Sequence, residues 1–275
     1  MPATIQKKRP GQKVKVASRG PGKAAHHAPT KGAPPTIDCD ATKRVVMGLA
    51  RKDPSVWFEN FGRIINKEGE LIKPRINVLQ RRVFEAWMYC KAMGIPCRII
   101  VCKPRQGGSS TGGMGLVYHE CQTAPQTTRA RIIGGKYKQV KNLWNILEVY
   151  SDNDKCLWPK GRANVLADRI EVGHSEITPE TANDPDAGRA GTFRLVVVTE
   201  LGRWREAGIA SAKKVLSGLL NCVPKEPGTL VLIESTAQGI GGEFDSRYEK
   251  AVSRAAFKAG RRGSGYIRIF AAWFE

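Results

Sequence analysis

The stretch Val101–Gly113, VCKPRQGGSSTGG, constrains the fold of this chain more than any other. An apolar strand is expected over Arg98–Cys102, a glycine-rich loop follows it, and a helix is expected over Gly112–Gln122. The adjacent glycines Gly107 and Gly108 let the backbone approach a phosphate closely. The N-terminus of the following helix offers free N–H groups and the positive end of its dipole. A strand, a glycine-rich loop and a helix in this order predict a phosphate-binding loop.

The loop departs from the usual pattern at its lysine. Against G-x-x-x-x-G-K-[ST], Gly108 fills the second glycine and Ser110 the final hydroxyl, but Ser109 stands where the lysine belongs and Lys103 where the first glycine belongs. The β- and γ-phosphates of a nucleotide still need a side-chain cation. Either Lys103 or Arg105 is expected to supply it from the near side of the loop. The alternative is a serine- and glycine-rich loop that binds no ligand.

A second apolar strand, expected over Arg194–Thr199, ends in the pair Thr199-Glu200. The usual pair in nucleotide hydrolases is Asp then Glu, in which the first carboxylate supports the Mg²⁺ shell and the second activates water. Glu200 keeps the second role, and Thr199 is expected to reach the metal shell through its hydroxyl, by way of water. Ser110 or Thr111 would give Mg²⁺ the hydroxyl of the loop. A surface glutamate that merely ends a strand is the alternative.

A third apolar strand, expected over Thr229–Glu234, runs into Ser235 and Thr236 and then into Gly239, Gly241 and Gly242. Hydroxyls at a strand end beside a γ-phosphate can sense its loss, and flexible glycines can transmit the shift. The alternative is a tight turn that needs glycine. Three strand ends of this kind are more specific together than apart, because ligands of open α/β sheets bind outside the carboxyl ends of the strands.

The remaining segments predict a doubly wound α/β domain. Most of the expected strands are short, rich in β-branched residues and almost continuously apolar, which is typical of a mostly parallel sheet covered by helices on both faces. Further strands are expected at Arg131–Gly135, Arg169–Val172 and Tyr266–Phe270, and further helices at Leu79–Met93, Lys138–Tyr150 and Gly242–Lys258.

The charge of the chain indicates a polyanionic partner. The 275 residues carry a formal net charge of +20, for which nucleic acid is the first candidate. Residues 1–36 hold eight Lys or Arg and no acid, with almost no large apolar side chain, so we expect a disordered basic arm there and a globular domain over residues 37–275. The seven cysteines show no zinc-ligand spacing, which favours a reducing cytosol, and no apolar run is long enough to span a membrane.

Several motifs together resemble the ATPase domain of a tailed-bacteriophage terminase large subunit. KPRQGGSST resembles the divergent Walker A loop of that family, VVVTELGRW its Walker B strand and IESTAQGIGGEF its coupling motif. AGRAGTF resembles a segment that carries an arginine finger, and Leu79-Gln80-Arg81 resembles the glutamine motif that precedes Walker A. The resemblance covers about Asp53 to Glu275. It implies a P-loop NTPase fold of the ASCE, RecA-like type.

The resemblance also implies roles for individual residues. Lys103 would be the displaced phosphate lysine, and Arg105 a second cation, on the phosphates or as a finger acting in cis. Arg189 would act in trans on the ATP of a neighbouring subunit, and Glu200 would orient or activate the attacking water. The other expected ATP-binding residues are Gln80, which would read adenine, and Gln106, Gly107, Gly108, Ser109, Ser110 and Thr111.

The function implied by the resemblance is ATP hydrolysis, with Mg²⁺, that drives double-stranded viral DNA into a procapsid. The implied partners are DNA, the phage portal protein, the small terminase subunit and further copies of the chain in a ring, a pentamer by family, in the host cell cytoplasm. The final residues AAWFE resemble the end of the family's ATPase domain, so we expect the nuclease domain to be absent and expect no DNA cleavage.

Two runs of basic residues are candidates for contacts with DNA phosphates, with solvated helix faces as the alternative. They are Lys136, Lys138 and Lys141, and Arg254, Lys258, Arg261 and Arg262. Two other functions stay open at this point. One is a helicase-like, DNA-dependent ATPase of the same fold. The other is a non-catalytic DNA-binding or assembly module that has lost turnover.

Overall fold

The structure of the chain is a computed structural model. The structure describes residues 39–154, 164–166, 168–184, 186–189, 191–208 and 210–272. The chain divides into two units, Met1–Asp38 and Cys39–Glu275, of which only the second contains described residues. The basic arm predicted for residues 1–36 therefore lies outside the described residues.

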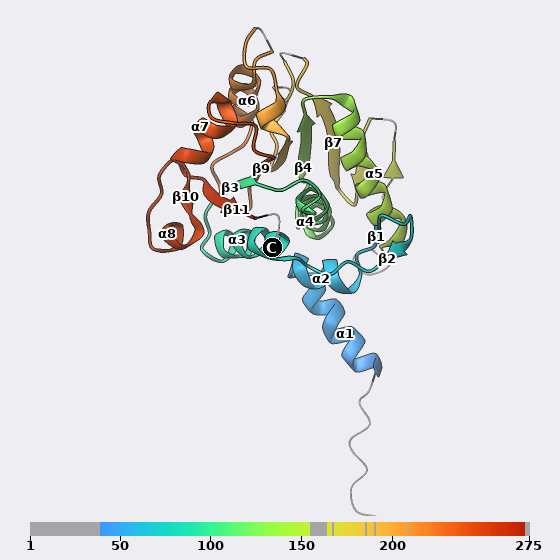
Figure 1. The fold of residues 1–275 in the computed structure, drawn as a ribbon. Helices are drawn as coiled ribbons and strands as arrows, with labels where there is room; N and C mark the ends of the chain where they lie inside the picture. Colours follow the sequence, from blue (N-terminus) through green and yellow to red (C-terminus); the bar gives the residue numbers. More distant parts are fainter. Residues whose placement is uncertain are drawn as a thin grey trace, which may run out of the picture. The chain divides into compact units, whose positions relative to one another are not determined.

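The second unit contains both helices and strands (Figure 1). The helices are α1 (Cys39–Ala50), α2 (Pro54–Asn60), α3 (Val78–Ala92), α4 (Ser109–Thr123), α5 (Tyr137–Asn153), α6 (Ala212–Asn221), α7 (Gly242–Lys250) and α8 (Arg254–Lys258), with a short 3-10 helix, η1 (Leu201–Arg203). The strands are β1 (Ile64–Ile65), β2 (Leu71–Ile72), β3 (Cys97–Cys102), β4 (Arg129–Gly134), β5 (Asn164–Val165), β6 (Ile170–Val172), β7 (Ser175–Thr181), β8 (Leu195–Thr199), β9 (Leu230–Ser235), β10 (Val252–Ser253) and β11 (Ile267–Phe270).

Nine of the described strands form one sheet, in the order β10-β11-β3-β9-β8-β4-β7-β6-β5, and β1 and β2 form a separate antiparallel hairpin. All neighbours from β10 to β7 are parallel, and only β6 and β5 at one edge are antiparallel. The mostly parallel sheet predicted from the apolar strands is confirmed. The strand β9 lies between β3 and β8, so three strand ends with polar residues are adjacent.

The two faces of the sheet are covered by different helices, as a doubly wound fold requires (Figure 1). Side chains alternate along each strand: Ile99 and Val101 of β3 pack with α2 to α5, whereas Ile100 packs with α6 and α7 on the opposite face. The first core is centred on aromatic side chains, with the rings of Trp57 and Tyr118 stacked 5.4 Å apart. Both faces are buried, which explains why the central strands are almost continuously apolar.

Two parts of the predicted secondary structure need correction. The single helix expected over Gly242–Lys258 is two helices, α7 and α8, separated by the edge strand β10. The break occurs because Ser253 caps α8, its hydroxyl accepting a hydrogen bond from the backbone N–H of Ala256 at 3.2 Å. The strand β7 was not predicted at all, although its residues Glu176–Thr181 pair with β4.

In the part of the chain that the structure describes, no helix is both long enough and apolar enough to cross a lipid bilayer.

Candidate active site

The three predicted strand ends lie next to one another, at the carboxyl ends of the central parallel strands. Since β3, β9 and β8 are adjacent and parallel, their carboxyl ends point the same way, with Cys102 opposite Ser235 and Thr199 opposite Glu234. The pairing continues one residue further on each side. The backbone N–H of Lys103 donates to the carbonyl of Ser235 at 3.0 Å, and that of Glu200 donates to the carbonyl of Glu234 at 2.7 Å. This ladder fixes where the side chains of Lys103 and Glu200 begin.

The glycine-rich loop is closed down onto the start of α4. Gly108 is the N-cap residue of α4 and has a φ of 69°, in the left-handed region that favours glycine. A Cβ at Gly108 would lie 3.0 Å from side-chain nitrogens of both Asn77 and Gln80, so the loop backbone sits directly against the start of α3. Gln106 also has a positive φ, of 61°. The three residues that follow Gly108 open α4 with N–H groups that have no partner within the helix, whereas the N–H of Gly112 donates to the carbonyl of Gly108 at 3.0 Å.

Gln80 ties α3 to this loop. It forms a capping box with Asn77, and its side-chain Nε2 donates to the carbonyl of Gly108 at 2.8 Å. Asn77 Nδ2 donates to the carbonyl of Gly107 at 3.0 Å. Gln80 is buried, and both ends of its amide are engaged by the protein in this structure. Reading of adenine by Gln80 stays a prediction, and it would have to use the second N–H of Nε2 or the second lone pair of Oε1.

Lys103 occupies the centre of the site. Its Nζ lies 3.1 Å from Glu234 Oε1, 3.3 Å from Glu200 Oε1 and 3.0 Å from Ser110 Oγ, and 10% of its side chain is exposed. Burial favours the neutral amine, but the two carboxylates outweigh it, so the pKa of Lys103 is raised. A displaced lysine that starts from the first residue of the loop therefore reaches the same place as the hydroxyl of Ser110.

Glu234 is the residue that sequence reasoning missed. Its side chain is fully buried, and it accepts hydrogen bonds from Ser109, from Ser110 at 2.5 Å, from Lys103 at 3.1 Å and from Thr199 at 3.1 Å. Burial opposes ionisation, but the ammonium of Lys103 and the serine hydroxyls outweigh it, and the pKa of Glu234 is lowered. The available signal was a carboxylate inside the apolar run LVLIES, because charged residues are rarely buried without partners.

Glu200 faces the same lysine from β8. Its backbone has a φ of 55°, which is unusual for a residue other than glycine and turns the chain directly into η1. Its carboxylate accepts a hydrogen bond from Thr236 Oγ1 at 3.3 Å and lies 3.5 Å from Arg203 Nε. The interpretation of Glu200 as a solvated surface residue does not fit these contacts, since it shares Lys103 with a buried carboxylate.

The two hydroxyls after β9 have different partners. Ser235 is fully buried, and its Oγ accepts from the backbone N–H of Gly202 in η1 at 3.1 Å while donating to the carbonyl of Thr236 at 2.9 Å. Thr236 donates to Glu200, as described above. The segment predicted to couple hydrolysis to movement is therefore bonded both to the carboxylate of Glu200 and to the helix that follows it. Thr111, by contrast, accepts from Tyr150 through its carbonyl at 2.9 Å.

Arg105 and Arg189 are not brought to this centre. Arg105 is exposed and makes no hydrogen bond or ion pair with another described residue. Arg189 is half-exposed, lies 3.2 Å from Asp186 and packs against Gly218 of α6. Its loop is held by Glu180, whose Oε2 accepts from the backbone N–H of Gly188 at 2.7 Å. An arginine finger acting in trans from this position stays a prediction.

The two runs of basic residues proposed to contact DNA differ in how many of their side chains form ion pairs or lie over aromatic rings. Lys138 and Lys141 are exposed on α5. In the second run, Arg254 forms an ion pair with Glu85, Lys258 lies over the ring of Tyr89 and Arg262 lies over that of Phe257, 4.5 Å from its centroid. The two exposed lysines on α5 are therefore freer to contact phosphates than Arg254, Lys258 and Arg262.

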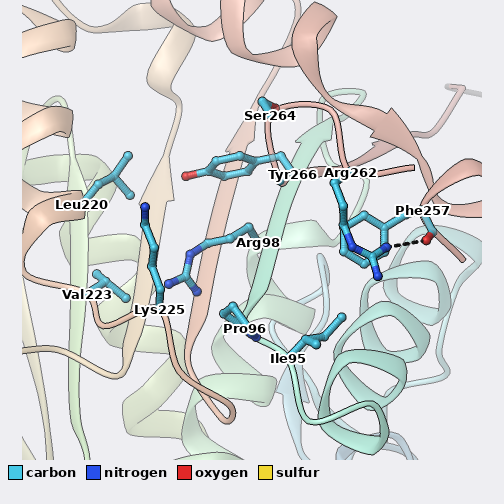
Figure 2. Close-up of a pocket in the computed structure, with 11 residues that line it drawn as sticks. Ile95, Pro96, Arg98, Leu220, Val223, Lys225, Phe257, Arg262, Ser264 and Tyr266 are labelled. Atoms are coloured by element: carbon cyan, nitrogen blue, oxygen red, sulfur yellow. Dashed lines mark hydrogen bonds between the residues drawn. The ribbon is translucent and has the colours of Figure 1, made fainter. Parts of the chain in front are cut away.

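A separate cavity of about 420 Å³ lies where β3 begins, at the opposite edge of the sheet (Figure 2). The two arginines that line it donate hydrogen bonds to backbone carbonyls. Arg98 donates to the carbonyls of Cys97 and Pro224, and Arg262 donates to that of Phe257 at 2.8 Å. None of the residues predicted to bind ATP lines this cavity.

The mostly parallel sheet flanked by helices is a fold of the P-loop NTPase type. No protein-family model matches the chain, and no curated protein matches it. Among solved structures, it is similar to the large terminase of bacteriophage HK97, with a TM-score of 0.59 and 12% sequence identity over 80% of this chain and 43% of that one. It is also similar to a point variant of the large terminase ATPase domain of Thermus phage P74-26, with a TM-score of 0.51 and 17% identity over 72% of this chain and 82% of that one.

The chain thus has the fold of phage large terminase ATPase domains, and the expected fold class is confirmed. It spans less than half the length of the HK97 protein. At such low identities the likeness concerns the fold alone.

Proposed function

We propose that this chain is the ATP-hydrolysing motor domain of a phage terminase large subunit, which moves double-stranded DNA into a procapsid. The observation that carries the proposal is the position of Lys103. It lies between the carboxylates of Glu200 and Glu234, beside a glycine-rich loop at the start of α4. A cation, a candidate base and free helix N–H groups at one sheet edge are what phosphoryl transfer needs from a protein.

The chemistry follows from these groups. Phosphates bound at the start of α4 would draw the ammonium of Lys103 away from the carboxylates and be neutralised by it. Glu200 would accept a proton from the attacking water, whose oxygen forms the new bond to the terminal phosphorus while the bond to the leaving ADP oxygen breaks. The products are ADP and inorganic phosphate. Mg²⁺, held by Ser110 with Thr199 nearby, would neutralise charge on the phosphates.

The bonds of Ser235 and Thr236 give hydrolysis a route to movement. Thr236 is bonded to Glu200, and Ser235 is bonded to η1. If Glu200 changes position after phosphate loss, its hydrogen bond to Thr236 would displace the residues that lead into the glycine-rich segment 239–242. We assign this segment the coupling role.

The partners we assign are DNA, the portal protein, the small terminase subunit and neighbouring copies of the chain. The copies would form a ring, which the resemblance to the family implies to be a pentamer, and the chain would act in the host cytoplasm. The formal net charge of +20 supports a sequence-independent grip on DNA phosphates. The exposed lysines Lys138 and Lys141 are the residues we assign to it.

The test is an ATPase assay on the whole chain with Mg²⁺, with and without DNA. We expect hydrolysis that double-stranded DNA accelerates and that added salt suppresses. Preferential acceleration by single-stranded DNA would instead indicate the helicase-like ATPase. Salt-sensitive DNA binding without any hydrolysis would indicate the non-catalytic module and overturn the proposal.

Arg189 is assigned the trans role, and a mixing experiment tests it. Arg189→Ala should lower hydrolysis by about 10³-fold or more only where subunits assemble, since arginine fingers contribute rate factors of that order. Mixing Arg189→Ala with Glu200→Gln subunits should restore part of the activity, because each partner supplies what the other lacks. Arg194→Ala, which removes an arginine bonded to the Pro227 carbonyl, is the control. No recovery in the mixture would contradict a trans role.

A further inference from the structure

Glu234 has more partners than a counter-ion for one lysine needs. Its Oε1 atom alone gathers Ser110 Oγ at 2.5 Å, Thr199 Oγ1 at 3.1 Å and Lys103 Nζ at 3.1 Å. Three different segments supply these atoms: the loop that follows β3, the helix α4 and the strand β8. The carboxylate oxygen is therefore the point on which the loop hydroxyl and the end of β8 converge.

Two of those atoms belong to the residues expected at the metal. In P-loop hydrolases the Mg²⁺ is held by the hydroxyl that ends the loop and by an aspartate at the end of the neighbouring strand. Here the hydroxyl is Ser110, but Thr199 stands in place of the aspartate. The direct cross-strand partner of Thr199 is Glu234. A carboxylate is therefore present on the neighbouring strand β9, directly opposite the position where the aspartate is expected on β8.

The chemistry of the oxygens fits a magnesium ion. Mg²⁺ prefers oxygen ligands and, at nucleotide sites, is bound through one or two carboxylates together with phosphates and water. The described residues contain no group of three or more His, Cys, Asp and Glu that would hold a metal without a nucleotide. A single carboxylate flanked by two hydroxyls, beside a phosphate-binding loop, is the arrangement expected where the nucleotide supplies the remaining ligands.

We propose that Glu234 supplies the carboxylate of the Mg²⁺ site in place of the absent Walker B aspartate, with Ser110 and Thr199 beside it. This inference rests on the proposed nucleotide-binding function and deepens it. In the nucleotide-free protein the ammonium of Lys103 neutralises Glu234. When Mg²⁺ and ATP bind, the metal takes over that charge and Lys103 is released to the phosphates, so Glu234 couples metal binding to arrival of the lysine.

The experiment measures nucleotide affinity rather than turnover. A fluorescent ADP is titrated into the full chain in Mg²⁺ and again in EDTA, for the parent chain and for Glu234→Gln, which keeps the shape of the side chain and removes its charge. In the parent, Mg²⁺ should tighten binding. In Glu234→Gln this gain should fall by about tenfold or more, as losses of groups around a metal typically do. Affinity in EDTA should stay equal or rise, because Lys103 then faces one carboxylate, that of Glu200, instead of two.

Glu200→Gln is the matched control, because it removes the other carboxylate beside Lys103 and should keep the gain from Mg²⁺. Titration of Mn²⁺ followed by electron paramagnetic resonance gives a second measure, with weaker binding of the metal expected only in Glu234→Gln. If Glu234→Gln fails to fold, Glu234→Asp replaces it. This variant should still fold, because aspartate keeps the negative charge beside Lys103. Its shorter side chain should reduce the gain from Mg²⁺ without abolishing nucleotide binding in EDTA.

An unchanged gain from Mg²⁺ in the Glu234 variants overturns the inference and leaves the nucleotide site intact. An equal loss of affinity in Mg²⁺ and in EDTA also overturns it, since Glu234 would then only shape the loop. Absence of nucleotide binding by the parent chain overturns the proposed function and this inference together.

Discussion

Replacing Glu200 by glutamine is expected to lower the rate of ATP hydrolysis by about 10²–10⁴-fold, the usual contribution of a general base. Glutamine keeps the size of the side chain and its bonding capacity toward Thr236 and Lys103 but cannot accept a proton from water. Lys103 retains Glu234 as a carboxylate partner, so the fold and the phosphate site should persist. We therefore expect nucleotide binding within a few-fold of the parent.

The measurement pairs steady-state hydrolysis with binding of a fluorescent nucleotide, so that loss of chemistry is separated from loss of the site. Glu226→Gln is a suitable control, because this largely exposed carboxylate precedes β9 at the opposite edge of the sheet. It should change neither quantity. Turnover by Glu200→Gln close to that of the parent chain would show that another group activates the water.

Replacing Lys103 by methionine is expected to remove hydrolysis and also to destabilise the protein. Methionine has a similar length but no charge, so Glu234 would be left fully buried without its cation. Breaking a buried ion pair on one side costs about 3–5 kcal/mol in free energy of unfolding. The phosphates would lose their cation as well, since the exposed Arg105 makes no contact with the site among the described residues.

The double variant Lys103→Met/Glu234→Gln separates the two effects. Neutralising both partners removes the unpaired charge, so most of the lost stability should return in a urea or guanidinium titration, while hydrolysis should not. Arg105→Ala is the comparison variant, and its free energy of unfolding should change by less than about 0.5 kcal/mol, as for most surface positions. If Arg105→Ala abolishes hydrolysis and Lys103→Met does not, Arg105 is the phosphate cation.

The sequence was sufficient for those parts of the fold in which the apolar pattern follows the backbone. Most of the strands that form the centre of the sheet were predicted within a residue or two, because burial on both faces makes them continuously apolar. The strand β7 was not, since its sequence SEITPET carries a proline and mostly polar side chains. Pro179 lies opposite Ile132 in a parallel pair, a position that local propensity argues against and only the tertiary context permits.

The site was predictable where chemistry is contiguous in sequence, and not where it depends on strand order. Lys103, Ser110 and Glu200 each follow or adjoin a recognisable motif, and the structure brings them together. The role of Glu234 depends on β9 lying between β3 and β8, and no periodicity in the chain states that order. In the sequence, the threonine that replaces the usual aspartate at position 199 and the glutamate at position 234 appear unrelated. Their connection is seen only in the sheet, where the two residues are direct cross-strand partners.

At position 200 the backbone conformation favours glycine, whereas the proposed chemistry needs glutamate, so stability and activity favour different residues. A residue with a side chain at a φ of 55° is strained by roughly 1 kcal/mol relative to glycine, which adopts this conformation freely. A selection for thermal stability alone should therefore enrich glycine or asparagine at position 200, while a selection for turnover should retain only glutamate. In a mutational scan scored both ways, position 200 would be where the two rankings diverge most sharply.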